Sequence, residues 1–152
     1  MPEAISFDEC HFLITGEIFM TTSISKPDVN TFLEDYANAL SKGDVKAIVA
    51  AWHTPSLVVS PEGVIAVSKS DEVEKFFKVS IADYNKKGIS GAKLHAADIT
   101  KISKSVATAS VTWSHTKPDG QPGGEEYAFY VLSKSGVAGK LGIDLYSPAN
   151  GV

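Results

Sequence analysis

Residues 28–52 read DVNTFLEDYANALSKGDVKAIVAAW, and this stretch decides the fold. Asp28 is predicted to cap a helix, and Gly43 to end it in the left-handed turn that suits a residue without a Cβ. Asp44 then caps a second helix, which Pro55 stops. The short connection predicts that the two helices pack closely. Their inward positions, at helical spacing, are Val29, Phe32, Leu33, Tyr36, Ala37 and Leu40, then Val45, Ile48, Val49 and Trp52.

A hairpin and a third helix are predicted next. Residues 56–60 form a strand, residues 61–63 a turn and residues 64–67 the returning strand. The third helix opens at Ser70 or Asp71, because Asp71 and Glu74 have the spacing of a capping box, and it ends near Gly88. Its inward residues are Val73, Phe76, Phe77, Ile81 and Tyr84.

The remainder of the chain is predicted as strands. They cover residues 94–102, 106–116, 126–132 and 137–146, with a Gly- and Pro-rich loop at residues 117–124. Helices first and strands afterwards predict an α+β domain, an antiparallel meander with its helices on one face. The 152 residues, 43% of them hydrophobic, suffice for one such domain.

Three segments resemble a known family: residues 36–44, residues 45–52 and residues 57–61. Their small-Gly-Asp turn, bulky aromatic and strand leading to a proline resemble the SnoaL-like and ketosteroid-isomerase-like branch of the nuclear transport factor 2-like superfamily. The resemblance implies a cone-shaped, cystatin-like fold with three N-terminal helices packed on a curved antiparallel β-sheet. It also implies a pocket and a homodimer. The domain is expected over residues 28–152, with residues 1–27 an N-terminal extension of unassigned structure.

Charge and composition limit the classes of molecule that the protein is expected to bind. The net charge of −4 and the pI near 5.5 argue against a nucleic-acid surface. All 14 basic residues are lysines, so bidentate binding of phosphate by a guanidinium group is excluded. No apolar run is long enough to span a membrane, and the N-terminus lacks the basic start of a signal peptide. The single Cys10 fits a reducing compartment, so the predicted location is cytoplasmic.

Cofactor and metal sites are not predicted. The sequence has no G-x-G-x-x-G, P-loop or G-x-S-x-G motif, so no cofactor is expected. Its four histidines show no metal-ligand spacing, and there is no cysteine cluster. The expected partner is a small apolar molecule.

Aromatic residues are the expected ligand-binding groups. Strand alternation puts Trp113 and His115 on the more apolar face of residues 106–116. The resemblance implies that Tyr130, Asp144 and Tyr146 face the cavity as well. The predicted ligand-binding residues are Tyr36, Trp52, Trp113, Tyr130 and Tyr146.

Asp144 and His115 are the candidate catalytic residues. Asp144 lies between two apolar residues, where burial would raise the pKa of its carboxyl group and suit it to acid–base catalysis. The alternative is a hydrogen-bonded structural carboxylate. His115 would pair with Asp144 if the strands bring them together. Tyr36 matches an oxyanion-donating tyrosine of ketosteroid isomerases, but Ser60 and Ala128 stand where those enzymes carry carboxylates, so steroid isomerisation by that route is not expected.

Two functions remain open. One is a small-molecule pocket protein, either a carrier or a cofactor-independent isomerase, cyclase or hydratase. The other is a non-catalytic dimerisation or protein-interaction module. Its contact area would come from the exposed sheet face at Tyr127, Phe129 and Val131.

Overall fold

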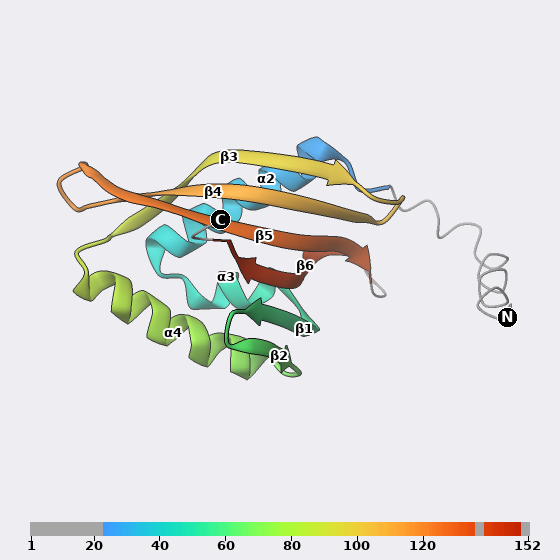
Figure 1. Ribbon diagram of the computed structural model, residues 1–152, viewed down its shortest axis with the longest axis horizontal. Coiled ribbons are helices and arrows are strands. Elements are labelled where there is room, and N and C mark those ends of the chain that lie inside the picture. The colour runs from blue at the N-terminus through green and yellow to red at the C-terminus, as the bar shows by residue number, and fades with distance from the viewer. Residues whose placement is uncertain (1–22, 136–138, 150–152) are drawn as a thin grey trace, which may run out of the picture.

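The computed structural model describes residues 23–135 and 139–149, and expectations for residues 1–22 lie outside that part of the chain. In this part of the chain three helices cover one side of a curved six-stranded sheet (Figure 1). In chain order the elements are α2 (Lys26–Lys42), α3 (Val45–Ala50), β1 (Trp52–Ser60), β2 (Gly63–Val67), α4 (Ser70–Lys86), β3 (Gly91–Lys101), β4 (Val106–Thr116), β5 (Pro122–Ser135) and β6 (Lys140–Pro148).

The first helix begins earlier than the sequence predicted. Ser25, not Asp28, is the N-cap, and its hydroxyl oxygen accepts a hydrogen bond from the Asp28 backbone N–H at 3.2 Å. Pro27 therefore lies in the first turn, where its missing N–H costs no helical hydrogen bond. The predicted end is confirmed, because Gly43 adopts φ 65° and ψ 29°.

The second helix is shorter than predicted. Asp44 caps it as expected, accepting from the Ala47 N–H at 3.2 Å. The helix ends at Ala50, and Trp52 already belongs to β1, so the strand begins four residues before Ser56. Pro55 does not end the helix; it lies in β1 where the register with β6 shifts, a position at which a missing N–H is tolerated.

The third helix has its predicted start but not its predicted cap. The Glu72 carboxylate accepts from the backbone N–H groups of Ser68 and Lys69, at 2.7 and 3.1 Å. Glu74 instead forms an ion pair with Lys78 one turn later, at 2.8 Å. The capping carboxylate is therefore two residues earlier than the Asp71–Glu74 spacing indicated.

The sheet is mixed rather than antiparallel throughout. Its strand order is β2-β1-β6-β5-β4-β3, and β1 runs parallel to β6 while the other neighbours are antiparallel. Parallel strands need a crossover connection, and here the part of the chain that includes α4 connects β1 to its parallel neighbour β6. Strand β4 has its predicted bounds. Strand β5 begins earlier than predicted, because the Gly- and Pro-rich loop pairs almost to its tip, at Thr116 and Pro122. Strand β3 also begins earlier, at Gly91, which pairs with Thr116 of β4.

The core lies between the helices and one face of the sheet. The predicted inward face of β4 is buried, from Ala107 to Trp113 in alternate positions. Leu33 of α2, Ile48 of α3 and Val73 of α4 pack into the same core. Among the described helices, none combines the length and apolarity needed to cross a membrane.

Candidate functional site

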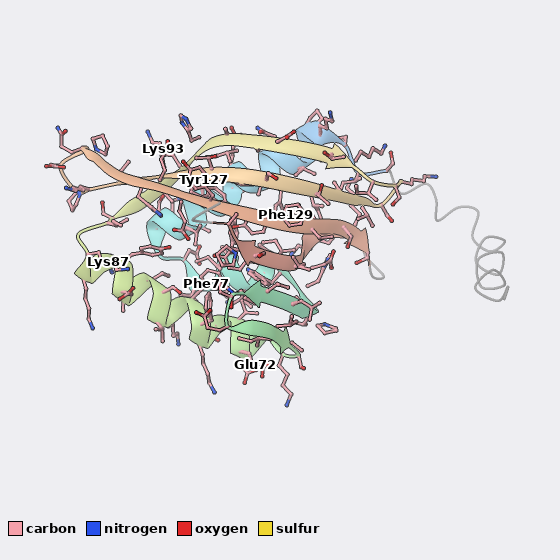
Figure 2. The ribbon with its side chains drawn as sticks, in the orientation of Figure 1. Glu72, Phe77, Lys87, Lys93, Tyr127 and Phe129 are labelled. Atoms are coloured by element: carbon pink, nitrogen blue, oxygen red, sulfur yellow. The ribbon has the colours of Figure 1, made fainter. Side chains whose placement is uncertain are left out.

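A cavity of about 250 Å³ lies between α2, α4 and the inner face of the sheet. Its wall is largely aromatic. Helix α2 contributes Tyr36 because this position falls on its buried stripe, and α4 contributes Phe77 from its sheet-facing side (Figure 2). The strands contribute side chains from inward positions. The aromatic lining residues on strands are Trp52, Trp113, Tyr130 and Tyr146.

The aromatic rings form one connected group. The centroid of Tyr36 lies 6.2 Å from Trp113, 6.5 Å from Tyr130 and 6.4 Å from Phe77. Tyr130 and Tyr146 are 5.5 Å apart, because they are register partners on β5 and β6. The predicted ligand-binding residues thus share one cavity, although they come from five different elements.

Two tryptophan–tyrosine hydrogen bonds order the polar atoms of this wall. The indole N–H of Trp52 donates to the Tyr36 hydroxyl at 3.0 Å, and that of Trp113 donates to the Tyr130 hydroxyl at 3.2 Å. An indole N–H is only a donor, so each tyrosine oxygen accepts and keeps its own proton to donate. No described residue accepts either proton.

The tyrosines stay neutral at physiological pH. Burial raises the pKa of Tyr36 and of Tyr130 above the ordinary value. Burial, together with the charge of Glu126, raises the pKa of Tyr146 to about 12. The inner part of the cavity therefore offers hydroxyl donors in an apolar wall.

A second polar cluster lines the same cavity. One oxygen of Glu126, Oε1, accepts from the Tyr84 hydroxyl at 2.6 Å and from His115 Nε2 at 2.8 Å. The hydrogen bond from His115 is the main reason why the pKa of Glu126 lies below its usual value, with a smaller contribution from Tyr84. An ionised carboxylate accepts only, so His115 carries a proton on Nε2. Its other ring nitrogen is buried and has no hydrogen-bond partner within the described chain.

The family can now be assigned. Residues 26–138 match the model of a family described as NTF2-like protein (DUF6841). The chain belongs to this NTF2-like family. No curated protein matches its sequence.

Solved structures agree with this NTF2-like fold. The chain is similar to an NTF-2 like protein of unknown function from Shewanella oneidensis MR-1, with a TM-score of 0.66 and 15% identity over 84% of this chain and 100% of the other. A protein of unknown function with a cystatin-like fold from Nostoc punctiforme PCC 73102 has a TM-score of 0.64 and 15% identity, over 83% of this chain and 92% of the other. A putative calcium/calmodulin dependent protein kinase II association domain from Xanthomonas campestris has a TM-score of 0.60 and 14% identity, over 87% of this chain and 97% of the other. At these identities the similarity shows the fold alone.

In this NTF2-like protein Asp144 does not line the cavity, contrary to the expectation. Its carboxylate lies 2.8 Å from Nδ1 of His53 and is about one-third exposed. A break in the β5–β6 register explains the difference, because Val131 pairs with Leu145 but Leu132 pairs with Ile143. Asp144 is the extra residue of a bulge, and such a residue interrupts strand alternation.

The predicted pair of His115 and Asp144 is therefore not formed. His115 lines the cavity and contacts Glu126, whereas Asp144 contacts His53. Ser60, at the position of an isomerase carboxylate, donates to Glu62 in the β1–β2 turn.

Glu126 and Tyr84 were not predicted as site residues. A signal for Glu126 was present, because it lies two and four residues before Ala128 and Tyr130 and so shares their strand face. Tyr84 was assigned to the inward stripe of its helix but not to a site. Within residues 23–135 and 139–149, no group of three His, Cys, Asp or Glu side chains is arranged to hold a metal ion.

Proposed function

We propose that this NTF2-like protein binds a small, mostly apolar molecule that carries an oxygen acceptor. The observation behind the proposal is the pair of tryptophan–tyrosine hydrogen bonds. In each of them the tyrosine hydroxyl, of Tyr36 or Tyr130, accepts a hydrogen bond and keeps an O–H proton that no described residue accepts, inside an aromatic cavity. A carbonyl or similar oxygen would accept these protons, while the rings of Trp52 and Trp113 cover the apolar body.

The cavity size favours a small ligand. Its volume of about 250 Å³ lies just below the roughly 300–1,000 Å³ typical of small-molecule sites. We assign the chain to the SnoaL-like branch on its sequence resemblance. We favour a carrier over an isomerase, cyclase or hydratase, because Ser60 and Ala128 replace the carboxylates of ketosteroid isomerases.

Calorimetric titration with 2-acetylnaphthalene, an apolar ketone, tests the proposal. Tyr36→Phe and Tyr130→Phe should each weaken binding about fivefold, the effect of one hydrogen bond. Tyr127→Phe is the matched control, because Tyr127 is 44% exposed and does not line the cavity. Absence of binding to the unmodified protein, or equal affinities in all three variants, would refute the proposal.

A second candidate is assembly through the outer face of the sheet. Tyr127 and Phe129 of β5 (Figure 2) border a hollow of about 410 Å³ on that face. The Xanthomonas campestris structure is described as an association domain, which suits this use of a similar fold. We propose a homodimer that buries this hollow. Sedimentation velocity should show a dimer that Tyr127→Glu dissociates; a monomeric unmodified protein would exclude it.

A further inference from the structure

The cavity has a second polar position at some distance from the tyrosine donors. Glu126 and Tyr130 lie four residues apart on the same face of β5, and both line the cavity. A strand rises about 3.3 Å per residue, so their backbones are separated by roughly 13 Å. Trp113, the register partner of Glu126, covers part of the interval. A ligand of sufficient length would contact both positions.

The two oxygens of Glu126 differ in what they bind. Oε1 accepts two hydrogen bonds, and these hold the carboxylate in one orientation. Oε2 accepts none from any residue that the structure describes, and it is not among the buried unpaired atoms. An ionised oxygen with free lone pairs, on a side chain that lines the cavity, is a site for a hydrogen-bond donor.

Nearby charges favour a neutral donor over a cation. Lys42 lines the same cavity, and the positive charge of Lys87 acts on Glu126. These two positive charges would oppose an ammonium group on the ligand, with that of Lys87 partly offset by its ion pair with Asp83 at 3.2 Å. A hydroxyl or amide N–H would make a weaker hydrogen bond to the carboxylate than an ammonium group, but without that repulsion.

We propose that Glu126 Oε2 accepts a hydrogen bond from a hydroxyl or N–H group at one end of the ligand. The other end carries the oxygen that Tyr36 and Tyr130 bind. The ligand class is thus an elongated apolar molecule with an acceptor at one end and a neutral donor at the other. This inference depends on the proposed function, since it requires a ligand in the cavity.

Four ketone probes test the inference by calorimetric titration at pH 7. They are 2-acetylnaphthalene and its 6-hydroxy, 6-methoxy and 6-aminomethyl derivatives. The hydroxy compound should bind about tenfold more tightly than the methoxy compound, which is about 1.4 kcal/mol. Tightest binding by the aminomethyl compound would instead identify an ammonium ligand and overturn the neutral-donor assignment.

Glu126→Gln gives the decisive comparison. Its amide oxygen can still accept from Tyr84 and His115, which turns the NH₂ group toward the former Oε2 position and replaces an acceptor with a donor. The hydroxy-over-methoxy preference should therefore disappear or reverse in this variant. Glu125→Gln is the matched control, because Glu125 points to Tyr127 and lies outside the cavity lining.

The outcomes separate this inference from the proposed function. A tenfold preference that survives in Glu126→Gln would overturn the role of Glu126, although ligand binding would stand. Equal binding of the hydroxy and methoxy probes to the unmodified protein would do the same. Failure of every probe to bind would refute both. Circular dichroism and thermal unfolding of each variant show that it is folded, and Glu126→Asp, which keeps the charge but shortens the side chain, provides a second perturbation.

Discussion

Replacing Gly142 with alanine tests how the side chain of His53 is held between β1 and β6. The new methyl carbon would lie 2.7 Å from two atoms of the His53 ring, whereas ordinary van der Waals contact begins at 3.4 Å. The ring cannot move aside freely. Its Nδ1 lies 2.8 Å from Asp144 Oδ1, and its Nε2 lies 3.0 Å from the carbonyl oxygen of Lys140.

The expected cost follows from these contacts. Both contacts are with acceptor oxygens, and a neutral imidazole can donate to only one of them. Moving the ring therefore costs one hydrogen bond, about 1 kcal/mol net, and crowding in the strand adds roughly 1 kcal/mol, so the variant should lose about 2 kcal/mol of unfolding free energy. For a chain of this size that corresponds to a melting temperature lower by roughly 4–8 °C. Urea denaturation measures the free energy, and an unchanged m-value confirms that the two-state comparison holds.

A double-mutant cycle with His53→Ala identifies the cause. Without the imidazole ring, the three atoms nearest to the new methyl carbon are gone, and the alanine removes the flexibility of a glycine within a strand. Gly142→Ala should then be neutral or slightly stabilising. An equal loss of stability in both backgrounds would mean that the ring contact is not responsible, and the explanation would be wrong.

Three further predictions concern other parts of the molecule. Gly91→Ala places a Cβ 2.8 Å from Thr116 Oγ1 and 3.3 Å from Ser41 Oγ, so it should destabilise by about 1–2 kcal/mol in urea denaturation, and Thr116→Ala should restore part of that loss. The pKa of Glu126 is lowered in the folded state, so this carboxylate stabilises the fold above its ordinary pKa near 4.5 and loses that effect as the pH falls. The difference in unfolding free energy between the unmodified protein and Glu126→Gln should therefore shrink below about pH 5. A difference that stays constant with pH would contradict the lowered pKa of Glu126. Ser25→Ala removes the cap from the Asp28 N–H and should cost about 1 kcal/mol, measured by thermal unfolding against the intact chain.

Local signals predicted much of the fold. Gly43 ends α2 and Asp44 caps α3, because a left-handed turn and a side-chain cap each depend on a few neighbouring residues. Alternation along β4 likewise identified Trp113 as an inward residue. The Ser25 cap and the start of β1 at Trp52 were missed, since several capping residues and short apolar runs competed over the same few positions.

Helical and strand periodicity in the sequence determined the inward faces of Tyr36 and Trp113, whereas the inward placement of Tyr130 and Tyr146 came from the family resemblance. Only the tertiary structure decided which polar groups join them. Asp144 turns to His53, a residue 91 positions earlier, because the β5–β6 ladder contains a bulge that depends on how two strands pair. Glu126 becomes the carboxylate of the cavity because α4 brings Tyr84 across from the opposite layer. Periodicity is a property of one segment, whereas register and the docking of a helix are set by contacts between segments.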